Sequence, residues 1–296
     1  MTNVVALGGG HGTAATLGAA RKYATTITAI VSVADDGGSS GRLRQALGIP
    51  APGDLRRCLV ALAKGDNPQD NPVAMAFEHR FGDDADPGLK GHALGNLVIA
   101  GLTAATGNFV EALHHAGRML EAQGRVLPAT ADAVVLKAVA AGGEVEGQVA
   151  VAKTSRIAYV TVVPPDARPP EQALDAIEHA DQLVLGPGSL FTSVLAVVAV
   201  PAIRQALAQR TQTQRLVYVC NLRTSAETVG FDVAAHLDAL TAHGVEPDVV
   251  LHDPAAGMAT GRPSTDIQIV EADLATDDQT AHDPAKLARA LADLVG

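Results

Sequence analysis

Short runs of β-branched residues alternate with Ala- and Leu-rich stretches along this chain, and this alternation limits the fold more than any other feature. Each run ends in Gly, Asp or Pro, and its apolar residues follow one another without regular polar interruption. Strands of that kind are covered by helices on both faces, as in a parallel sheet built from βαβ units. The sequence therefore predicts an α/β fold with a mostly parallel sheet between helices. The clearest strands are residues 4–7, 27–33, 157–163, 183–185, 216–220 and 249–251.

Two regions depart from this alternation. Between residues 42 and 124 the apolar residues recur at helical spacing and no comparable strand appears, which predicts a mainly helical insertion. Residues 125–153 contain a Gly142-Gly143 turn and an alternation of Val and Gly, which predicts a small β excursion. We expect both regions to decorate one α/β domain over residues 1–296.

The C-terminal part of the chain contains an acidic segment, residues 271–283, that is expected to be a solvated loop. Asp283 and Pro284 then offer a cap and a first residue to a helix, since an N-cap carboxylate and an N1 proline both favour a helix start.

The composition is that of a folded, acidic protein. Hydrophobic residues make up 47% of the 296 residues, so a sizeable core is available. The formal charge of −10 argues against broad contact with nucleic acid or an anionic membrane surface. The longest mostly apolar run, residues 190–203, is shorter than the roughly 20 residues that a bilayer span needs. We expect no nucleic-acid partner, no membrane insertion and, because no cationic signal region is recognisable, a cytoplasmic protein.

A glycine loop after the first strand is the strongest local signal for a ligand. Its glycines leave backbone N–H groups accessible, and the helix that follows presents its positive N-terminal end, so the loop suits a phosphate. The pattern Gly10-x-Gly12-x-x-Ala15 also matches the dinucleotide-binding fingerprint, which makes the predicted sheet Rossmann-like. A sharp turn without ligand stays open. The candidate ligand contacts here are Gly9, Gly10, His11, Gly12 and Thr13.

The second strand ends in the run ADDGGSSGR at residues 34–42. Asp35 follows the first loop at about the distance, ~20 residues, of the ribose-binding acid of a Rossmann unit. Asp36 could hold Mg²⁺ through phosphate oxygens. Arg42 is the preferred phosphate ligand, because a guanidinium fork matches phosphate oxygens. An Asp-Gly turn with a Ser helix cap is the alternative without ligand. The candidate contacts are Asp35, Asp36, Ser39, Ser40 and Arg42.

Later positions complete the candidate site. His92 and Asn96 are four residues apart at the start of an apolar stretch and would share one helix face, although such a His is often a satisfied core or cap residue. A second glycine loop follows the strand 183–185, and the strand 216–220 ends in polar residues. Ligands of open α/β sheets bind beyond the carboxyl ends of the strands, so these segments would face one crevice. The candidate contacts are His92, Asn96, Gly186, Gly188, Ser189, Asn221 and Thr224.

These motifs resemble the YvcK-type gluconeogenesis factor family. The resemblance rests on GGGxG at 8–12, ADDGGSSGRLR at 34–44, PGDLR at 52–56, GHxxGN at 91–96 and GPGSL at 186–190, whose order spans most of the chain. More distantly the chain is similar to the CofD 2-phospho-L-lactate transferases, which lack the SSGR extension. The resemblance implies a single CofD-like domain in a cytoplasmic protein that binds UDP-sugars such as UDP-N-acetylglucosamine. It also implies a role in cell shape and peptidoglycan-linked growth on gluconeogenic carbon sources, and no firmly attached reaction.

The chain departs from the family pattern near the expected ligand. His11 stands where threonine is usual, Ala93-Leu94 replace a Ser-Phe pair, and residues 221–228 are one residue short. These departures affect which ligand binds more than which class of ligand binds.

Two functions follow, with binding expected to be the main one. In the first, the protein is a regulatory protein that binds a nucleotide sugar, without a certain cofactor. In the second, it is a Mg²⁺-dependent transferase of the CofD kind that moves a phospho-acyl group from a nucleotide-diphosphate donor, with Asp36, Asp54 and His92 as candidate catalytic residues. Asp54 could instead cap a helix. A nicotinamide oxidoreductase rests on the glycine pattern alone. A homodimer through an apolar helix of the insertion stays open.

Overall fold

A computed structural model describes residues 1–65, 70–264 and 267–295, and its centre is a seven-stranded sheet in which all strand pairs are parallel. The strand order is β10-β9-β8-β7-β1-β2-β3. The chain therefore builds outward from β1 to β3, returns to β7 beside β1, and builds outward again on the other side, as in a Rossmann fold. The strands are β1(Asn3–Gly8), β2(Thr26–Val31), β3(Arg125–Pro128), β7(Gln182–Leu185), β8(Arg215–Val219), β9(Val249–His252) and β10(Gln268–Glu271).

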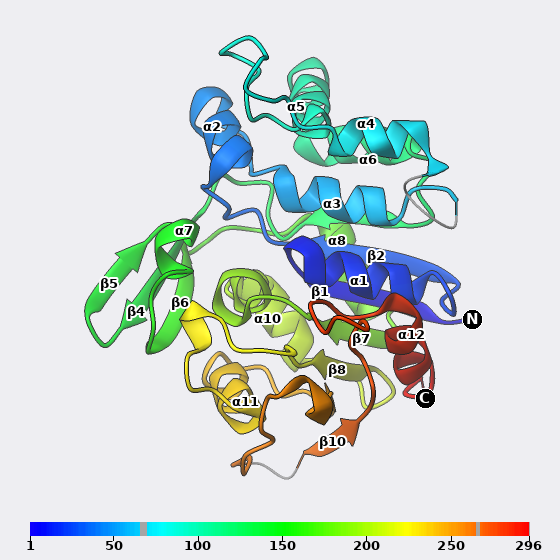
Figure 1. Cartoon of the computed structure of the whole chain (residues 1–296), viewed down its shortest axis with the longest axis vertical. Coiled ribbons are helices and arrows are strands. Elements are labelled where there is room, and N and C mark those ends of the chain that lie inside the picture. The colour runs from blue at the N-terminus through cyan, green and yellow to red at the C-terminus, as the bar shows by residue number, and fades with distance from the viewer. Residues whose placement is uncertain (66–69, 265–266, 296) are drawn as a thin grey trace.

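Helices cover both faces of this sheet, as predicted (Figure 1). On one face α1(Gly10–Ala20) packs against α3(Gly53–Ala61) and α12(Pro284–Ala292). On the other, α8(Glu171–Glu178) packs against α10(Pro201–Ala208). The predicted start of the last helix is confirmed, because the Asp283 carboxylate accepts the backbone N–H groups of Ala285 and Lys286 at 2.7 and 2.9 Å. The remaining helices of this part are η2(Leu190–Val194), a π-helical turn, α9(Leu195–Val198), η3(Ala226–Thr228), α11(Val233–Ala242) and η4(Pro254–Ala256).

The predicted helical insertion is confirmed and lies above the sheet in Figure 1. It begins with α2, slightly earlier than predicted, because Gly38 and the serines after it already belong to a helix. Its helices besides α3 are α2(Gly38–Leu47), α4(Pro72–Glu78), α5(Leu94–Thr106) and α6(Phe109–Met119).

The β excursion differs from the prediction in its boundaries. A small antiparallel sheet has the order β5-β4-β6 and consists of β4(Val135–Ala140), β5(Gly143–Glu146) and β6(Ile157–Val163). The assignment of 157–163 to the parallel sheet was therefore wrong. Its exposed and buried residues largely alternate, as expected of a strand with one solvated face. Residues 125–128 form the edge of the main sheet instead, and the Val-Gly alternation ends in a helical turn, α7(Gln148–Val151).

The segment 271–283 is solvated only in part: residues 277–281 are exposed, as its acidic composition predicted, whereas two other points of the segment are buried. Leu274 is fully buried and His282 is nearly so, and the Asp253 carboxylate accepts the N–H groups of Leu274 and Ala275 at 2.8 and 3.1 Å. Two buried attachments hold this acidic segment against the carboxyl ends of β8 and β9, because His282 also contacts the backbone after β8.

No single described helix is long and apolar enough to cross a membrane. The helices Leu190–Val198 and Pro201–Ala208 reach that length and apolarity only when taken together, and the chain bends by 79° between them.

Candidate functional site

The two glycine loops touch each other at the point where the strand order reverses. The first follows β1 and the second follows β7, its neighbour in the sheet. A Cβ atom on Gly12 would lie 2.0 Å from the carbonyl oxygen of Pro187, and the Thr16 hydroxyl donates to the Gly186 carbonyl at 2.6 Å. Reversal points of this kind are where open α/β sheets bind ligands. The two glycine loops therefore lie together at the carboxyl ends of β1 and β7.

The start of α1 has no side-chain cap of its own, but the buried Asp54 carboxylate of α3 lies against it. Gly9 precedes the helix without a side-chain cap, and the first turn contains no acidic residue. Thr13 is occupied within the loop, since its hydroxyl donates to the Gly9 carbonyl at 3.3 Å. The Gly10 N–H already donates to Asp54, so a phosphate at this end of the helix would use the other N–H groups of the first turn.

The second loop is held by side chains of its own chain. Asn221 accepts the Gly188 N–H at 3.0 Å, so this predicted ligand contact is at least partly a loop anchor. Glu227, which the sequence analysis missed, is buried and accepts the Phe191 N–H at 3.2 Å and the Thr192 hydroxyl at 3.0 Å. Burial raises the pKa of the Glu227 carboxyl above its usual value. A carboxylate therefore lies at both helix starts, Glu227 after the second loop and Asp54 at the start of α1.

A cavity of about 260 Å³ adjoins both loops. Residues that no motif predicted form its far wall: Arg223 after β8 and the segment Gln279 to His282. His282 Nε2 lies 3.2 Å from the Cys220 carbonyl, and burial lowers the pKa of His282 to about 4. A neutral His282 thus ties the segment to β8 at neutral pH. The lining residues are His11, Gly12, Ala15, Pro187, Gly188, Asn221, Leu222, Arg223, Gln279, Thr280, Ala281 and His282.

His11 lines this cavity from the first turn of α1. The surrounding protein and the positive charges of Arg57 and Arg56 lower the pKa of His11, although Glu78 opposes them. His11 therefore meets a ligand at neutral pH mainly as an uncharged imidazole, which can donate or accept a hydrogen bond.

Asp54 lies against the first glycine loop and does not cap a helix. It belongs to the first turn of α3, whose cap position is Pro52. A Cβ on Gly9 would lie 2.7 Å from its Oδ2, and the Arg57 guanidinium donates to its Oδ1 at 2.7 Å. Burial raises the pKa of the Asp54 carboxyl, and the negative charge of Asp35 adds to this, against the opposing effect of Arg57. A carboxyl with a raised pKa beside a phosphate loop has the properties of a general base.

The acidic and serine residues after β2 already have partners within the chain. Asp35 Oδ1 accepts the Gly37 N–H at 2.9 Å, and Ser40 Oγ accepts the Gly53 N–H at 3.1 Å. Asp36 Oδ1 accepts the Val149 N–H at 2.9 Å and so ties the segment before α2 to α7. The described residues contain no group of three or more His, Cys, Asp or Glu side chains placed to hold a metal ion.

Ser39, His92 and Asn96 form a second buried cluster, which lies between the first turn of α2 and the start of α5. The helical spacing predicted for His92 and Asn96 was wrong, since α5 starts at Leu94, yet both side chains reach Ser39. The Ser39 hydroxyl lies 3.0 Å from His92 Nδ1 and accepts from Asn96 Nδ2 at 3.0 Å. Its own proton is then directed to Nδ1, which leaves Nε2 of His92 as the donor. Burial and the charges of Arg42 and Arg80 lower the pKa of His92.

Arg42 lies with this second cluster. Its guanidinium donates to the Lys90 carbonyl at 2.6 Å, and it lines a cavity of about 680 Å³ with Ser39, Lys90 and Gly91. This cavity and the crevice have no lining residue in common. The structure therefore divides the predicted contacts into two groups. His11, Gly12, Gly188 and Asn221 line the crevice, and Gly9, Gly10 and Gly186 belong to the loops beside it. Ser39 and Arg42 line the other cavity, His92 and Asn96 contact Ser39, and Thr224 is exposed beyond Arg223.

The comparison with known proteins agrees with the motifs. The family described as 2-phospho-L-lactate transferase CofD matches residues 4–291. A gluconeogenesis factor of Halalkalibacterium halodurans is 42% identical over 256 residues, which are 84% of this chain and 77% of the relative. The gluconeogenesis factor of Bacillus subtilis is 40% identical over 243 residues, 81% of this chain and 74% of that protein. The crystal structure of a UPF0052-family protein from Bacillus halodurans is 35% identical and superposes with a TM-score of 0.86, covering 98% of both chains.

Proposed function

This chain belongs to the CofD family, and we propose that it is a gluconeogenesis factor that works by binding a nucleotide sugar, of the UDP-N-acetylglucosamine type, in the crevice between its two glycine loops. Binding without turnover would make it a sensor of sugar-nucleotide supply for cell-wall growth and cell shape. The observation that supports this proposal most strongly is the contact of the two loops beside a cavity that His11 and Arg223 line.

The diphosphate is assigned to the first turn of α1. There the N–H groups and the helix dipole favour negative charge, and Arg223 lines the same cavity. His11 and Asp54, on two sides of the loop, are assigned to sugar or ribose hydroxyls, because an uncharged imidazole and a carboxylate both pair with hydroxyl groups.

The test is calorimetry of the purified protein with UDP-N-acetylglucosamine, with UDP, GDP, GTP and NAD as comparators, each with and without Mg²⁺. We expect binding of the UDP-sugar and recovery of the ligand unchanged. Arg223→Gln should weaken binding about tenfold or more, since a charge-assisted phosphate contact is lost. Arg289→Gln removes the same charge from the last turn of α12 and should leave the affinity unchanged. A protein that gives no heat and no thermal shift with any of these nucleotides at millimolar concentration contradicts the proposal.

The second candidate function is a phospho-acyl transfer, and the raised pKa of Asp54 favours it. An acceptor hydroxyl would give its proton to Asp54, and its oxygen would bond to the diphosphate phosphorus that carries the transferred group, remote from the nucleoside. The bond from that phosphorus to the bridging oxygen would break, and the nucleoside monophosphate would leave with that oxygen. Mg²⁺ commonly needs only one or two carboxylates plus substrate phosphates, which Asp36 or Asp54 could supply. Release of nucleoside monophosphate that disappears in Asp36→Asn and Asp54→Asn would replace the sensor with this transferase. Metal-independent binding without release contradicts it.

A further inference from the structure

The turn from β2 into α2 contains a serine pattern that the proposed function does not use. Residues 37–41 have the sequence GGSSG, which matches G-x-S-x-G and includes the first turn of α2. In hydrolases with this pattern, a sharp turn between a strand and a helix presents the serine as a nucleophile. Here Gly38 has a φ of +48°, and a Cβ on Gly41 would lie 2.0 Å from the Asp36 carbonyl oxygen. The chain therefore makes a turn that only glycine permits at these two positions.

The serine in the middle of this pattern, Ser39, contacts a histidine from a distant part of the chain. Its Oγ lies 3.0 Å from His92 Nδ1, although 53 residues separate the two. Both side chains are more than nine-tenths buried. Burial and the positive charges of Arg42 and Arg80 lower the pKa of His92. The imidazole is therefore uncharged at neutral pH and can accept the Ser39 proton at Nδ1, as a general base does for a nucleophile.

Asn96 is the third member of this cluster. Its Nδ2 donates to Ser39 Oγ at 3.0 Å, so the proton of Ser39 itself is directed to His92. The Oδ1 atom of the same amide is buried and accepts no hydrogen bond from the described residues. Buried polar groups normally have a partner, and one without a partner costs stability. The unpartnered Asn96 oxygen therefore indicates that this amide serves a ligand beside Ser39 and not the fold alone.

The start of α2 supplies backbone N–H groups next to the Ser39 hydroxyl. The first N–H groups of a helix have no acceptor within it, and in the described chain neither a side-chain cap nor an acidic residue lies in the first turn of α2. Groups of this kind stabilise the negative oxygen that forms when a nucleophile adds to a carbonyl carbon. The neighbouring Ser40 does not compete as a nucleophile, because its Oγ accepts the Gly53 N–H at 3.1 Å.

The cavity in front of Ser39 indicates which substrates fit. It has a volume of about 680 Å³, and Arg42, Lys90 and Asp83 are the charged residues that line it. Lys90 and Asp83 form an exposed salt bridge at 3.0 Å, so Arg42 provides the excess positive charge. A guanidinium at the rim favours a substrate with a negative group close to the reacting carbonyl.

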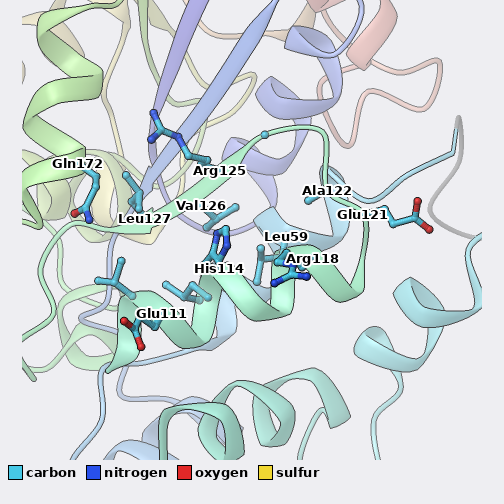
Figure 2. Close-up of a pocket in the computed structure, with 14 residues that line it drawn as sticks. Leu59, Glu111, His114, Arg118, Glu121, Ala122, Arg125, Val126, Leu127 and Gln172 are labelled. Atoms are coloured by element: carbon cyan, nitrogen blue, oxygen red, sulfur yellow. The ribbon is translucent and has the colours of Figure 1, made fainter. Parts of the chain in front are cut away.

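The groove at the β3 edge of the sheet lacks this combination of groups. It has a volume of about 640 Å³, and Figure 2 shows His114 in its wall. No Ser, Thr or Cys is present among the described residues that line it. His114 therefore has no nucleophile to activate there, whereas His92 does.

We propose that Ser39 and His92 form a nucleophile–base pair that hydrolyses carboxylic esters carrying a negative charge. Ser39 Oγ bonds to the carbonyl carbon while its proton passes to His92 Nδ1, and the N–H groups at the start of α2 hold the carbonyl oxygen. The carbon–oxygen bond to the alcohol then breaks, and the alcohol leaves with the proton from His92. Water next adds to the acyl carbon and gives a proton to His92. The carboxylic acid leaves as Ser39 Oγ takes that proton back.

The test is hydrolysis of 4-nitrophenyl acetate and of its 3-carboxy derivative by the intact protein, followed by release of the nitrophenolate. We expect turnover of both esters, with kcat/KM about tenfold higher for the carboxylated ester, because Arg42 pairs with its carboxylate. Ser39→Ala should abolish turnover, and His92→Gln should lower kcat about 100-fold, as expected for the loss of a general base. Arg42→Gln should remove the preference between the esters. Ser155→Ala, which changes an exposed serine before β6, should alter neither rate.

A fluorophosphonate that reacts with activated serines separates the chemistry from effects on folding. It should label Ser39 in wild type, as identified by mass spectrometry, and label the same serine at least tenfold more slowly in His92→Gln. The labelling rate in wild type should rise with pH through a pKa below 6.5, because His92 must be uncharged to take the proton. Circular dichroism shows whether both variants remain folded.

Three results would overturn this proposal. The first is a wild type that reacts with neither ester nor the fluorophosphonate, and the second is equal turnover or labelling in wild type and Ser39→Ala. The third, faster hydrolysis of the neutral ester than of the carboxylated one, rejects an anionic substrate. None of these results depends on nucleotide-sugar binding, since the crevice and this cavity have no lining residue in common.

Discussion

Gly12 is the residue on which the contact between the two glycine loops depends most directly. Its Cβ position is 2.0 Å from a backbone carbonyl, Pro187 O, which cannot rotate away as a side chain could. We predict that Gly12→Ala destabilises the protein by about 3 kcal/mol, at the upper end of overpacking effects, and abolishes nucleotide-sugar binding. Urea denaturation and calorimetry measure the two effects.

Gly101 in α5 is the matched control, because no atom lies within 4 Å of its Cβ position. Gly101→Ala should stabilise the fold by about 0.5–1 kcal/mol and leave binding unchanged. Equal effects of the two substitutions would mean that the loops separate easily and that their contact does not build the site.

The buried carboxylate of Asp54 should lower the free energy of unfolding at neutral pH. Its folded-state pKa is raised, so the folded protein binds more protons than the unfolded chain and stability falls as the pH rises through this window. We predict that Asp54→Asn is about 1 kcal/mol more stable than wild type at pH 7, with the gain lost near pH 3, where Asp54 is protonated in both states. Thermal unfolding at both pH values is the measurement. A variant that is less stable at pH 7 would show that the pair with Arg57 outweighs the burial of charge.

Sequence patterns found the residues that backbone geometry demands and missed those that only tertiary contact brings in. The glycines at 12 and 188 follow from local motifs, because a sharp loop after a strand needs them. Glu227 and His282 have no local signal, since each acts on a segment more than 30 residues away. Arg42 lines another cavity than His11 and Gly12, which no local motif indicates.

At the scale of elements, His243 joins the small antiparallel sheet to α11. Its Nδ1 must donate to the Ala239 carbonyl, 2.6 Å away, so its Nε2 accepts the Val160 N–H at 3.0 Å. Burial, aided by Arg204, lowers the pKa of His243, so the folded state binds fewer protons than the unfolded chain. This contribution to stability is complete above the ordinary histidine pKa of 6.5 and is lost as the pH falls through the folded value.

We predict that His243→Phe loses about 1–3 kcal/mol at pH 7.5, because the Val160 N–H is left buried without an acceptor. The difference from wild type should narrow as the pH falls to 5, since protonation removes the acceptor in wild type as well. Urea denaturation of both proteins at a series of pH values isolates His243 from the other buried histidines, which both proteins share. A difference that stays constant with pH would contradict this role.

Helices and strands were predictable where the local sequence pattern determines them, and less so where pairing with another strand determines them. The helices of the insertion and the cap of α12 follow from periodicity and from Asp283. The run Ile157–Val163 has the composition of a strand in either sheet, and only the antiparallel pairing with β4 decides between them. The four-residue strand β10 ends at Glu271, where the acidic segment begins, and only its pairing with β9 identifies it as a strand.

At the scale of the whole molecule, the first and last parts of the chain are interleaved and should unfold together. Strand β1 lies between β2 and β7 at the centre of the sheet, and α12, the last helix, packs on α1, the first. Neither half can keep a complete core without the other, so we predict one cooperative thermal transition in which the calorimetric and van't Hoff enthalpies agree. A nucleotide sugar should move this single transition to higher temperature, because the crevice exists only when both halves are assembled. At 100 times its Kd the ligand should add about 2.7 kcal/mol to the free energy of unfolding. Two separate transitions, with only one of them moved by ligand, would instead divide the chain into independent folding units and leave the crevice within one of them.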